Sequence, residues 1–175
     1  AINSTVTDNA NVLSVEQEQF FDRHIRTLYD NSKVQVAVLT IDTTQPLPIE
    51  DFGIQVAEKW AGGEKGEDLG VIFILAIQDR GMRIELGEGM EGYISDGQSR
   101  LILDSIKPQL RAGRYGKGTG MVLSAIATHV GESVVATEFK QVPASKESAQ
   151  RKSQPSETHS EKKPRQKNSF FRQFF

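Results

Sequence analysis

Cysteine is absent from the 175 residues, and its absence removes several classes of protein at once. Without a thiol there is no disulfide framework, no thiolate zinc site and no cysteine nucleophile. Long hydrophobic runs are absent too: a transmembrane helix needs about 18 apolar residues, whereas the longest run, GVIFILAI at 70–77, has the length of a strand. A hydrophobic content of 37% in a chain of this length predicts one globular core.

The formal net charge of −2 hides two chemically different parts. Residues 1–139 carry 12 Lys+Arg against 20 Asp+Glu, whereas residues 140–175 carry nine against three. Because Lys and Arg supply most of the non-specific affinity for phosphate backbones, the acidic part is not expected to bind nucleic acid. We predict a globular domain over 1–139 and a basic tail over 140–175.

Hydrophobic periodicity predicts alternating helices and strands in the globular part. Ser14 is a predicted N-cap with Gln17 three residues later, as in a capping box. The predicted elements are a helix from Ser14, a strand over 33–42, a helix from Pro48 to Gly62, a fully apolar strand over 71–77, its hairpin partner MRIEL at 82–86, and two helices around Ile106 and Ile126. A fully apolar strand is typical of a sheet that is covered on both faces. The sequence therefore predicts an α/β fold in which a mixed central sheet has helices on both faces.

Both ends of the chain have features typical of an exported protein that is held at a membrane. The opening AINSTVTDNA lacks a starting methionine and is the expected start of a mature chain after removal of a signal peptide. From about Gln141 the chain is rich in Ser, Lys, Gln, Glu and Pro, which predicts a disordered tail. The closing SFFRQFF is interpreted as an interfacial anchor, as the approach to a transmembrane helix, or as an end without a role.

Residues 83–92, RIELGEGMEG, contain the spacing G-x-G-x-x-G at Gly87, Gly89 and Gly92. A dinucleotide-binding loop would lead into a helix, with an acidic residue about 20 positions later at the end of the next strand. Here the loop follows the last predicted strand, and its glutamates would repel a pyrophosphate. The loop is therefore interpreted as a cation site.

Two acidic loops provide candidate ligands for that cation. Glu88, Glu91 and Asp96 lie in or just after the glycine-rich loop, and Asp68 ends a second acidic loop directly before the apolar strand. Hard cations such as Ca²⁺ take six to eight oxygen ligands from carboxylates, backbone carbonyls and water. We predict that the two loops lie near the same end of the sheet and share the site. The alternative is a solvated acidic face without an ion.

Several motifs in a fixed order resemble the TPM domain family. They are VTD near the start, QVAVLTID, a helix that ends in EKW, GEKGEDLGVIFIL, RIELGEGMEGYISD and PQLRAGRYGKG. The resemblance covers about residues 5–130. It implies a three-layer α/β/α sandwich, and a domain that bacteria export by a signal peptide and often tether by a later transmembrane helix.

The resemblance also implies a divalent ion, most often calcium, at acidic loops. The positions that match the family's motifs are Asp8 of VTD, Asp68 of EDLG, Glu91 of GMEG and Asp96 of YISD. Glu88 departs from the family, in which an aromatic residue often lies between the first two glycines. Its added carboxylate would strengthen a cation site or create one.

An acidic constellation without an evident nucleophile favours a binding role over an enzyme. No histidine is close to the acidic loops in sequence, and no Asp-x-Asp motif is present. We expect an exported, calcium-binding domain of the periplasm or cell envelope, which acts as a membrane-associated adaptor or modulator for a protein partner. Some family members are credited with acid phosphatase activity. The alternative is therefore a metal-dependent acid phosphatase, with a metal-activated water and with Arg80, Arg83 or Arg114 as anion ligands.

Overall fold

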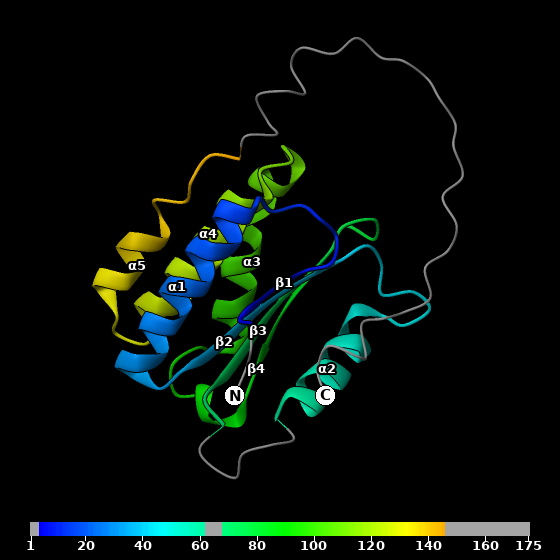
Figure 1. The fold of residues 1–175 in the computed structure, drawn as a ribbon. Helices are drawn as coiled ribbons and strands as arrows, with labels where there is room; N and C mark the ends of the chain where they lie inside the picture. Colours follow the sequence, from blue (N-terminus) through cyan, green and yellow to red (C-terminus); the bar gives the residue numbers. More distant parts are fainter. Residues whose placement is uncertain (1–3, 62–67, 146–175) are drawn as a thin grey trace.

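The computed structural model describes residues 4–61 and 68–145, in which a sheet of four strands lies between two helical layers (Figure 1). The elements in chain order are β1 (Val6–Asp8), α1 (Val15–Ser32), β2 (Gln35–Ile41), α2 (Ile49–Ala61), β3 (Gly70–Ala76), β4 (Gly81–Leu86), η1 (Glu88–Met90), α3 (Asp96–Arg111), α4 (Tyr115–His129) and α5 (Ser133–Phe139). The tail was predicted to be disordered over 140–175, but residues 140–145 are described, with Val142 packed against the core and Pro143 O accepting from Gln17 Nε2 at 2.8 Å. The rest of the predicted tail, 146–175, lies outside the described residues.

The strand order is β1-β2-β3-β4, with β1, β2 and β3 parallel and β4 antiparallel to β3. The predicted α/β fold with a mixed sheet is confirmed. Three elements were not predicted from the sequence, the three-residue strand β1, the three-residue 3₁₀ helix η1 and the seven-residue helix α5. All three are too short for a periodic pattern to emerge.

The parallel strands give the sheet two distinct edges. At the carboxyl edge β1, β2 and β3 end and α1, α2 and α4 begin. At the amino edge β2 and β3 begin and β4 ends, because β4 returns antiparallel with Leu86 opposite Val71. Asp68 and Leu69, directly before β3, and the loop after β4 therefore lie at the amino edge, whereas the loop after β1 lies at the carboxyl edge.

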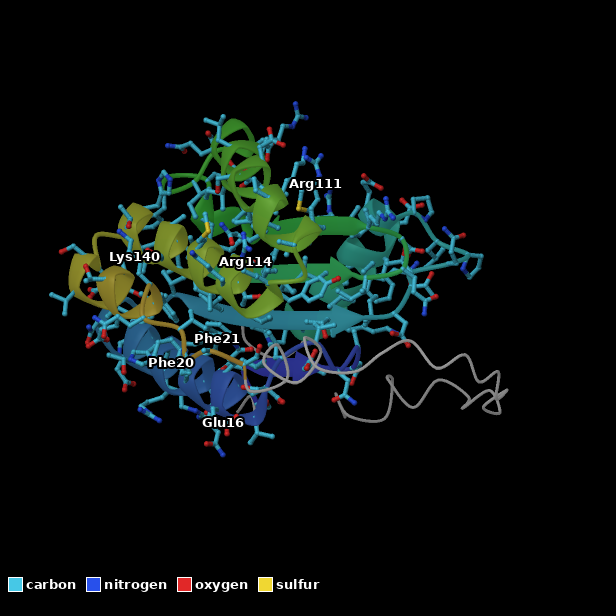
Figure 2. The ribbon with its side chains drawn as sticks, turned by 90° about the horizontal axis from the view of Figure 1, so that it is seen from above. Glu16, Phe20, Phe21, Arg111, Arg114 and Lys140 are labelled. Carbon is cyan, nitrogen blue, oxygen red and sulfur yellow. The ribbon has the colours of Figure 1, made fainter. Side chains whose placement is uncertain are left out.

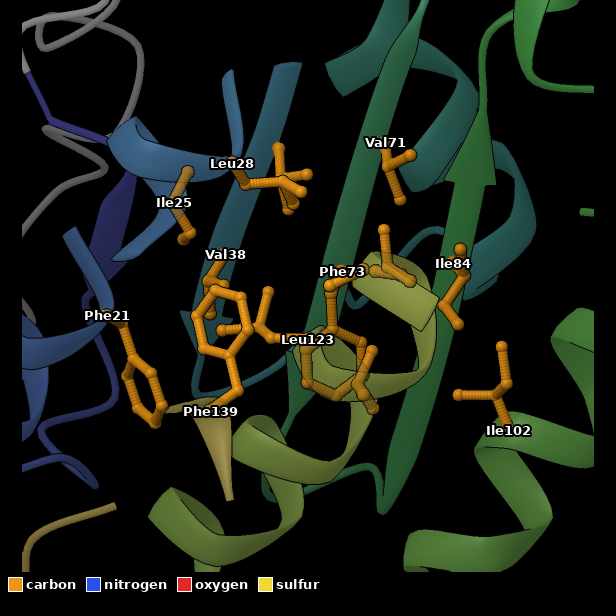
Figure 3. Close-up of a cluster of buried hydrophobic side chains, with 14 of the residues drawn as sticks. Phe21, Ile25, Leu28, Val38, Val71, Phe73, Ile84, Ile102, Leu123 and Phe139 are labelled. Atoms are coloured by element: carbon orange, nitrogen blue, oxygen red, sulfur yellow. The ribbon is translucent and has the colours of Figure 1, made fainter. Parts of the chain in front are cut away.

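The apolar residues of β2 and β3 alternate between two cores. On one face, Val38 and Phe73 pack with the buried side chains of α1, α3, α4 and α5. Figure 3 shows this larger core, in which Phe21 of α1 and Phe139 of α5 lie beside Val38. On the other face, the strand residues pack against α2, which among the described helices covers that face alone (Figure 1). The packing thus gives the three-layer α/β/α arrangement.

The two helical crossovers of the parallel strands lie on opposite faces. β1-α1-β2 and β2-α2-β3 step across the sheet in the same direction, but α1 packs on one face and α2 on the other. Two such crossovers have opposite hands, so one of them departs from the right-handed rule that nearly all connections of this kind follow.

Local signals explain where the main helices begin. Ser14 is the N-cap of α1, and its side chain accepts from the backbone N–H of Gln17 while the Gln17 side chain accepts from Ser14 N–H. This predicted capping box is confirmed. Ser95 and Gln98 form the same reciprocal pair at the start of α3. Each box satisfies two backbone donors that a helix N-terminus otherwise leaves unpaired.

Candidate functional site

Asp68 lies directly beside the glycine-rich loop. The backbone N–H of Gly87 donates to Gly70 O at 2.8 Å, and the N–H of Gly89 donates to Asp68 O at 3.0 Å. These bonds extend the β3–β4 ladder beyond the strands themselves. Asp68, the described end of the second acidic loop, is therefore adjacent to the glycine-rich loop, as the sequence predicts.

The glycines leave the space in which the Asp68 carboxylate lies. A Cβ atom on Gly87 would collide with the carboxylate and the backbone carbonyl of Asp68. A Cβ on Gly70 would lie 3.2 Å from Asp68 Oδ1, which is already a tight approach. From the sequence, the glycines were expected to let backbone carbonyls turn toward a bound cation. The structure instead shows the Asp68 side chain packed against the backbone of Gly87.

Buried apolar residues hold the loop after β4 in place. Met90, at the end of η1, is 0% exposed, and Ile94 is 1% exposed. The side chains of Glu88, before Met90, of Glu91, between Met90 and Ile94, and of Asp96, after Ile94, are exposed. Asp96 is also the first residue of α3, where a negative charge is stabilised by the helix dipole without any ion.

Asp8, the fifth predicted ligand, lies at the other edge of the sheet. Its register partner is Thr40, which is itself opposite Leu75 of β3. Asp68 precedes Leu75 by seven residues along β3, which corresponds to about 23 Å at about 3.3 Å per residue. The structure therefore groups the other four predicted ligands at the amino edge and leaves Asp8 apart from them.

Asp8 has a structural role that the sequence did not indicate. Its carboxylate accepts from the backbone N–H groups of Val12 at 3.2 Å and Leu13 at 2.8 Å. It also accepts a short hydrogen bond from the Thr40 hydroxyl, and Thr40 is fully buried. The carboxylate thus fixes the turn between β1 and α1 and ties it to β2.

No preformed cation cage exists in the part of the chain that the structure describes. Across residues 4–61 and 68–145, no three carboxylates or imidazoles converge closely enough to hold a metal ion. Glu64 and Glu67 of the second acidic loop lie outside the described residues. A cation at the amino edge would therefore depend on few described carboxylates, together with backbone carbonyls and water.

Glu18, on the first turn of α1, is a second carboxylate close to Asp8. Burial and, to a smaller degree, the negative charge of Asp8 raise the pKa of Glu18 above its ordinary value. Sequence analysis missed this pair because the two residues are ten positions apart across a turn. Their proximity depends on the angle at which α1 leaves the turn that Asp8 fixes, and no local sequence pattern specifies that angle.

We expect Glu18→Gln to stabilise the domain slightly at neutral pH. A raised folded-state pKa means that ionised Glu18 is disfavoured in the folded protein, so its contribution is favourable below about pH 4 and is lost as the pH rises through the folded pKa. Because the side chain is partly exposed, the gain should stay below about 1 kcal/mol. Urea denaturation at pH 7 and pH 3 checks this, with the difference between variant and wild type vanishing at pH 3. A gain of equal size at both pH values would contradict it.

The arginines considered for anion binding do not lie at the amino edge. Arg80 follows β3 at the carboxyl edge. Arg114 precedes α4 at the same edge, where its Nε donates to Gln109 Oε1 at 2.7 Å, and Arg111 lies close by (Figure 2). Arg83 is within β4 and donates to the Glu85 carboxylate of the same strand. Arg80 and Arg114 therefore lie at the edge opposite Asp68, and Arg83 lies within β4, paired with Glu85.

Histidine and tryptophan contribute to packing. The His24 ring contacts those of Phe20 and Phe139 in tilted arrangements, with Nδ1 2.7 Å from Phe20 O and Nε2 3.6 Å from the Glu138 carboxylate. Trp60 packs in the core beneath α2, as its place on the helical stripe predicts. The exposed aromatic near the acidic loop is Tyr93, with 45% of its surface accessible.

Comparison with known proteins gives a family and a fold. The model of the TPM domain matches residues 6–129. The solution NMR structure of the N-terminal domain of a protein from P. gingivalis is 30% identical, with a TM-score of 0.62, and the match covers 80% of this chain and 84% of that one. A search of curated proteins found no match.

Two more distant structures share the fold. The NMR structure of BA42 protein from the psychrophilic bacterium Bizionia argentinensis is 18% identical, with a TM-score of 0.54, over 77% of this chain and 87% of that one. The N-terminal domain of cg2496 protein from Corynebacterium glutamicum is 16% identical, with a TM-score of 0.56, over 83% and 86%. Among the described residues, no helix combines the length and hydropathy needed to cross a bilayer.

Proposed function

The chain belongs to the TPM domain family, and on that premise we propose that it binds a divalent cation, calcium in the first place, at the acidic loops of the amino edge. We further propose that the loaded domain serves as an exported, membrane-associated adaptor for a protein of the cell envelope. The observation that carries the proposal is the contact between Asp68 and the glycine-rich loop, because it places a carboxylate from one acidic loop against the backbone of the other.

The proposed ligand set follows from the exposure of the acidic side chains. Asp68, Glu88, Glu91 and Asp96 are all exposed and lie on segments at one edge of the sheet. Ca²⁺ accepts irregular shells of six to eight oxygens, so one or two of these carboxylates with carbonyls and water suffice for weak binding. Since no cage is preformed in the described part of the chain, we expect an affinity in the range of about 10⁻⁴ to 10⁻³ M, as in extracellular calcium modules.

An adaptor role is supported by the surroundings of the acidic loops and by the charge of the tail. Tyr93 exposes 45% of its surface beside Glu91, which offers an aromatic contact next to the bound ion. Tyrosine is enriched at protein interfaces because it combines a large apolar area with a polar tip. The tail carries nine Lys+Arg against three Asp+Glu, a balance that attracts anionic lipid surfaces.

A calcium titration of the full chain by NMR tests the proposal. We expect saturable amide shifts confined to the segments around Asp68 and residues 85–96, with at least tenfold weaker binding in Asp68→Asn. The matched control is Asp104→Asn, since Asp104 is an exposed acid of α3 that pairs with Lys107. Absence of saturable shifts at either segment would overturn calcium binding.

The same variants separate the adaptor from the enzyme alternative. Turnover of a generic phosphomonoester that survives repurification and is lost in Asp68→Asn, but kept in Asp104→Asn, would replace the adaptor by a metal-dependent acid phosphatase. Calcium binding without turnover would support the adaptor.

A further inference from the structure

The outer edge of β4 is open to another strand. The backbone N–H of Gly87 donates to Gly70 O of β3. In an antiparallel pair every second residue directs its N–H and C=O toward the neighbouring strand, so Arg83 and Glu85 also direct theirs toward β3. The N–H and C=O groups of Met82, Ile84 and Leu86 therefore point away from the sheet. Within the described residues, none of these outward groups forms a hydrogen bond. β4 is thus an edge strand of six residues with unpaired backbone.

At the other edge of the sheet, the chain itself provides partners for the outward carbonyls. β1 has only three residues, and the register turns the carbonyls of Val6 and Asp8 outward. The Ser4 hydroxyl donates to Val6 O at 2.6 Å, and Asn11 N–H donates to Asp8 O at 3.4 Å. Soluble proteins commonly protect edge strands in this way against pairing with other chains. The outward carbonyls of β1 thus have partners within the chain, whereas the outward backbone groups of β4 have none among the described residues.

The sequence of β4 is complementary to itself. In the stretch MRIEL at 82–86, reversal about Ile84 exchanges Met82 with Leu86 and Arg83 with Glu85. An antiparallel pair of two β4 strands, centred on Ile84, would place Arg83 opposite Glu85 of the second copy, and would do so twice. The same register pairs the outward backbone groups of Met82 and Leu86, so charge and hydrogen-bond geometry select one alignment.

The two helices beside β4 expose apolar side chains of their own. α2 and α3 both pack against β4, on opposite faces of the sheet. Ile54 of α2 is 47% exposed, and Leu101 of α3 is 69% exposed. Strand pairing alone buries little area, whereas stable interfaces bury roughly 1,200 to 2,000 Å². Contacts from both helices would supply the remaining area.

We propose that β4 pairs with β4 of a second copy, which joins two four-stranded sheets into one sheet of eight strands around a two-fold axis. Such an interface is isologous, and each residue of one copy meets the complementary residue of the other. Arg83 and Glu85, which already pair within each chain, form an alternating network of four charges across the axis.

The first experiment is sedimentation equilibrium of the full chain. We expect a concentration-dependent dimer for the wild type and a dissociation constant at least about tenfold higher for Arg83→Glu, which places like charges opposite each other. The double variant Arg83→Glu/Glu85→Lys restores opposite charges both within and between chains, so its dimer should return. A wild type that remains monomeric up to about 1 mM, or a dimer that Arg83→Glu leaves unchanged, overturns the proposal. If the protein is monomeric, the outer edge of β4 would be available to a strand of a different protein.

Mixing two single variants separates pairing between chains from pairing within them. Arg83→Glu and Glu85→Lys each lack the ion pair of their own chain, but a heterodimer of the two has opposite charges at both cross-strand positions. We expect the mixture to dimerise while each variant alone does not, with circular dichroism used to confirm that both are folded. If Glu85→Lys fails to fold, because the Glu85 side chain is only 13% exposed, the comparison of wild type with the single variant Arg83→Glu carries the test. No dimer in the mixture of folded variants would contradict the register.

Discussion

Replacing Phe139 by alanine should reduce the free energy of unfolding by about 3–5 kcal/mol, the usual range for a fully buried phenylalanine. Phe139 ends α5 and is 0% exposed. Its ring contacts His24, with centroids 5.8 Å apart, and packs in the larger core beside Phe21 (Figure 3). Thermal unfolding followed by circular dichroism should show a midpoint lower by roughly 10 °C.

Val134→Ala is the matched control for this prediction. Val134 lies on the same short helix but is 71% exposed, so its truncation should change stability by less than about 0.5 kcal/mol. The comparison bears on where the folding unit ends, because the family model stops at residue 129 and α5 begins at Ser133. Equal, small effects of both variants would mean that α5 is dispensable and that the unit ends with α4.

Asp8→Ala should cost about 2–3 kcal/mol of stability and leave calcium binding unchanged. The substitution removes the acceptor of three donors, the N–H groups of Val12 and Leu13 and the hydroxyl of Thr40. Leaving a buried donor unpaired costs about 1–3 kcal/mol, and the largest part should come from Thr40, which water cannot reach. Urea denaturation measures the loss of stability, and the calcium titration measures the affinity.

Asp104→Ala provides the comparison for Asp8→Ala, because its carboxylate is exposed and pairs only with Lys107 among the described groups. It should lose less than about 0.5 kcal/mol. If Asp8→Ala kept its stability but lost calcium affinity, then Asp8 would be a ligand of a site at the carboxyl edge. The proposed site at the amino edge would then be wrong.

The sequence was most informative where a physical requirement extends over many residues. The apolar stretch of β3 identified a strand covered on both faces, and the stripe that includes Trp60 identified the buried side of α2. The capping box at Ser14 identified the start of α1 to the residue. β1 was missed because three residues show no period, and its position in the sheet depends on pairing with a strand about 30 residues away.

Proximity within the candidate site could be predicted from the sequence where it follows directly from a hairpin. Asp68 lies beside Gly89 because β3 and β4 are consecutive strands, and their register continues into the flanking loops. Asp8 was grouped with Asp68 by family motif alone, and motif order does not show at which edge of the sheet a residue lies. The proximity of Glu18 to Asp8 required the angle at which α1 leaves the turn, which no local pattern specifies.

Because α1 and α2 lie on opposite faces of the sheet, one core is built from residues close together in the sequence and the other from residues far apart. The core beneath α2 is built from β2, α2 and β3, which follow one another along one continuous stretch of the chain, 35–76. The layer that holds Phe139 joins helix α1 near the beginning to helices α4 and α5 near the end, across about 100 residues. Local contacts form faster than distant ones because they close shorter loops. The continuous stretch is therefore the natural early-folding unit, and the larger core is completed only when both ends of the domain are available.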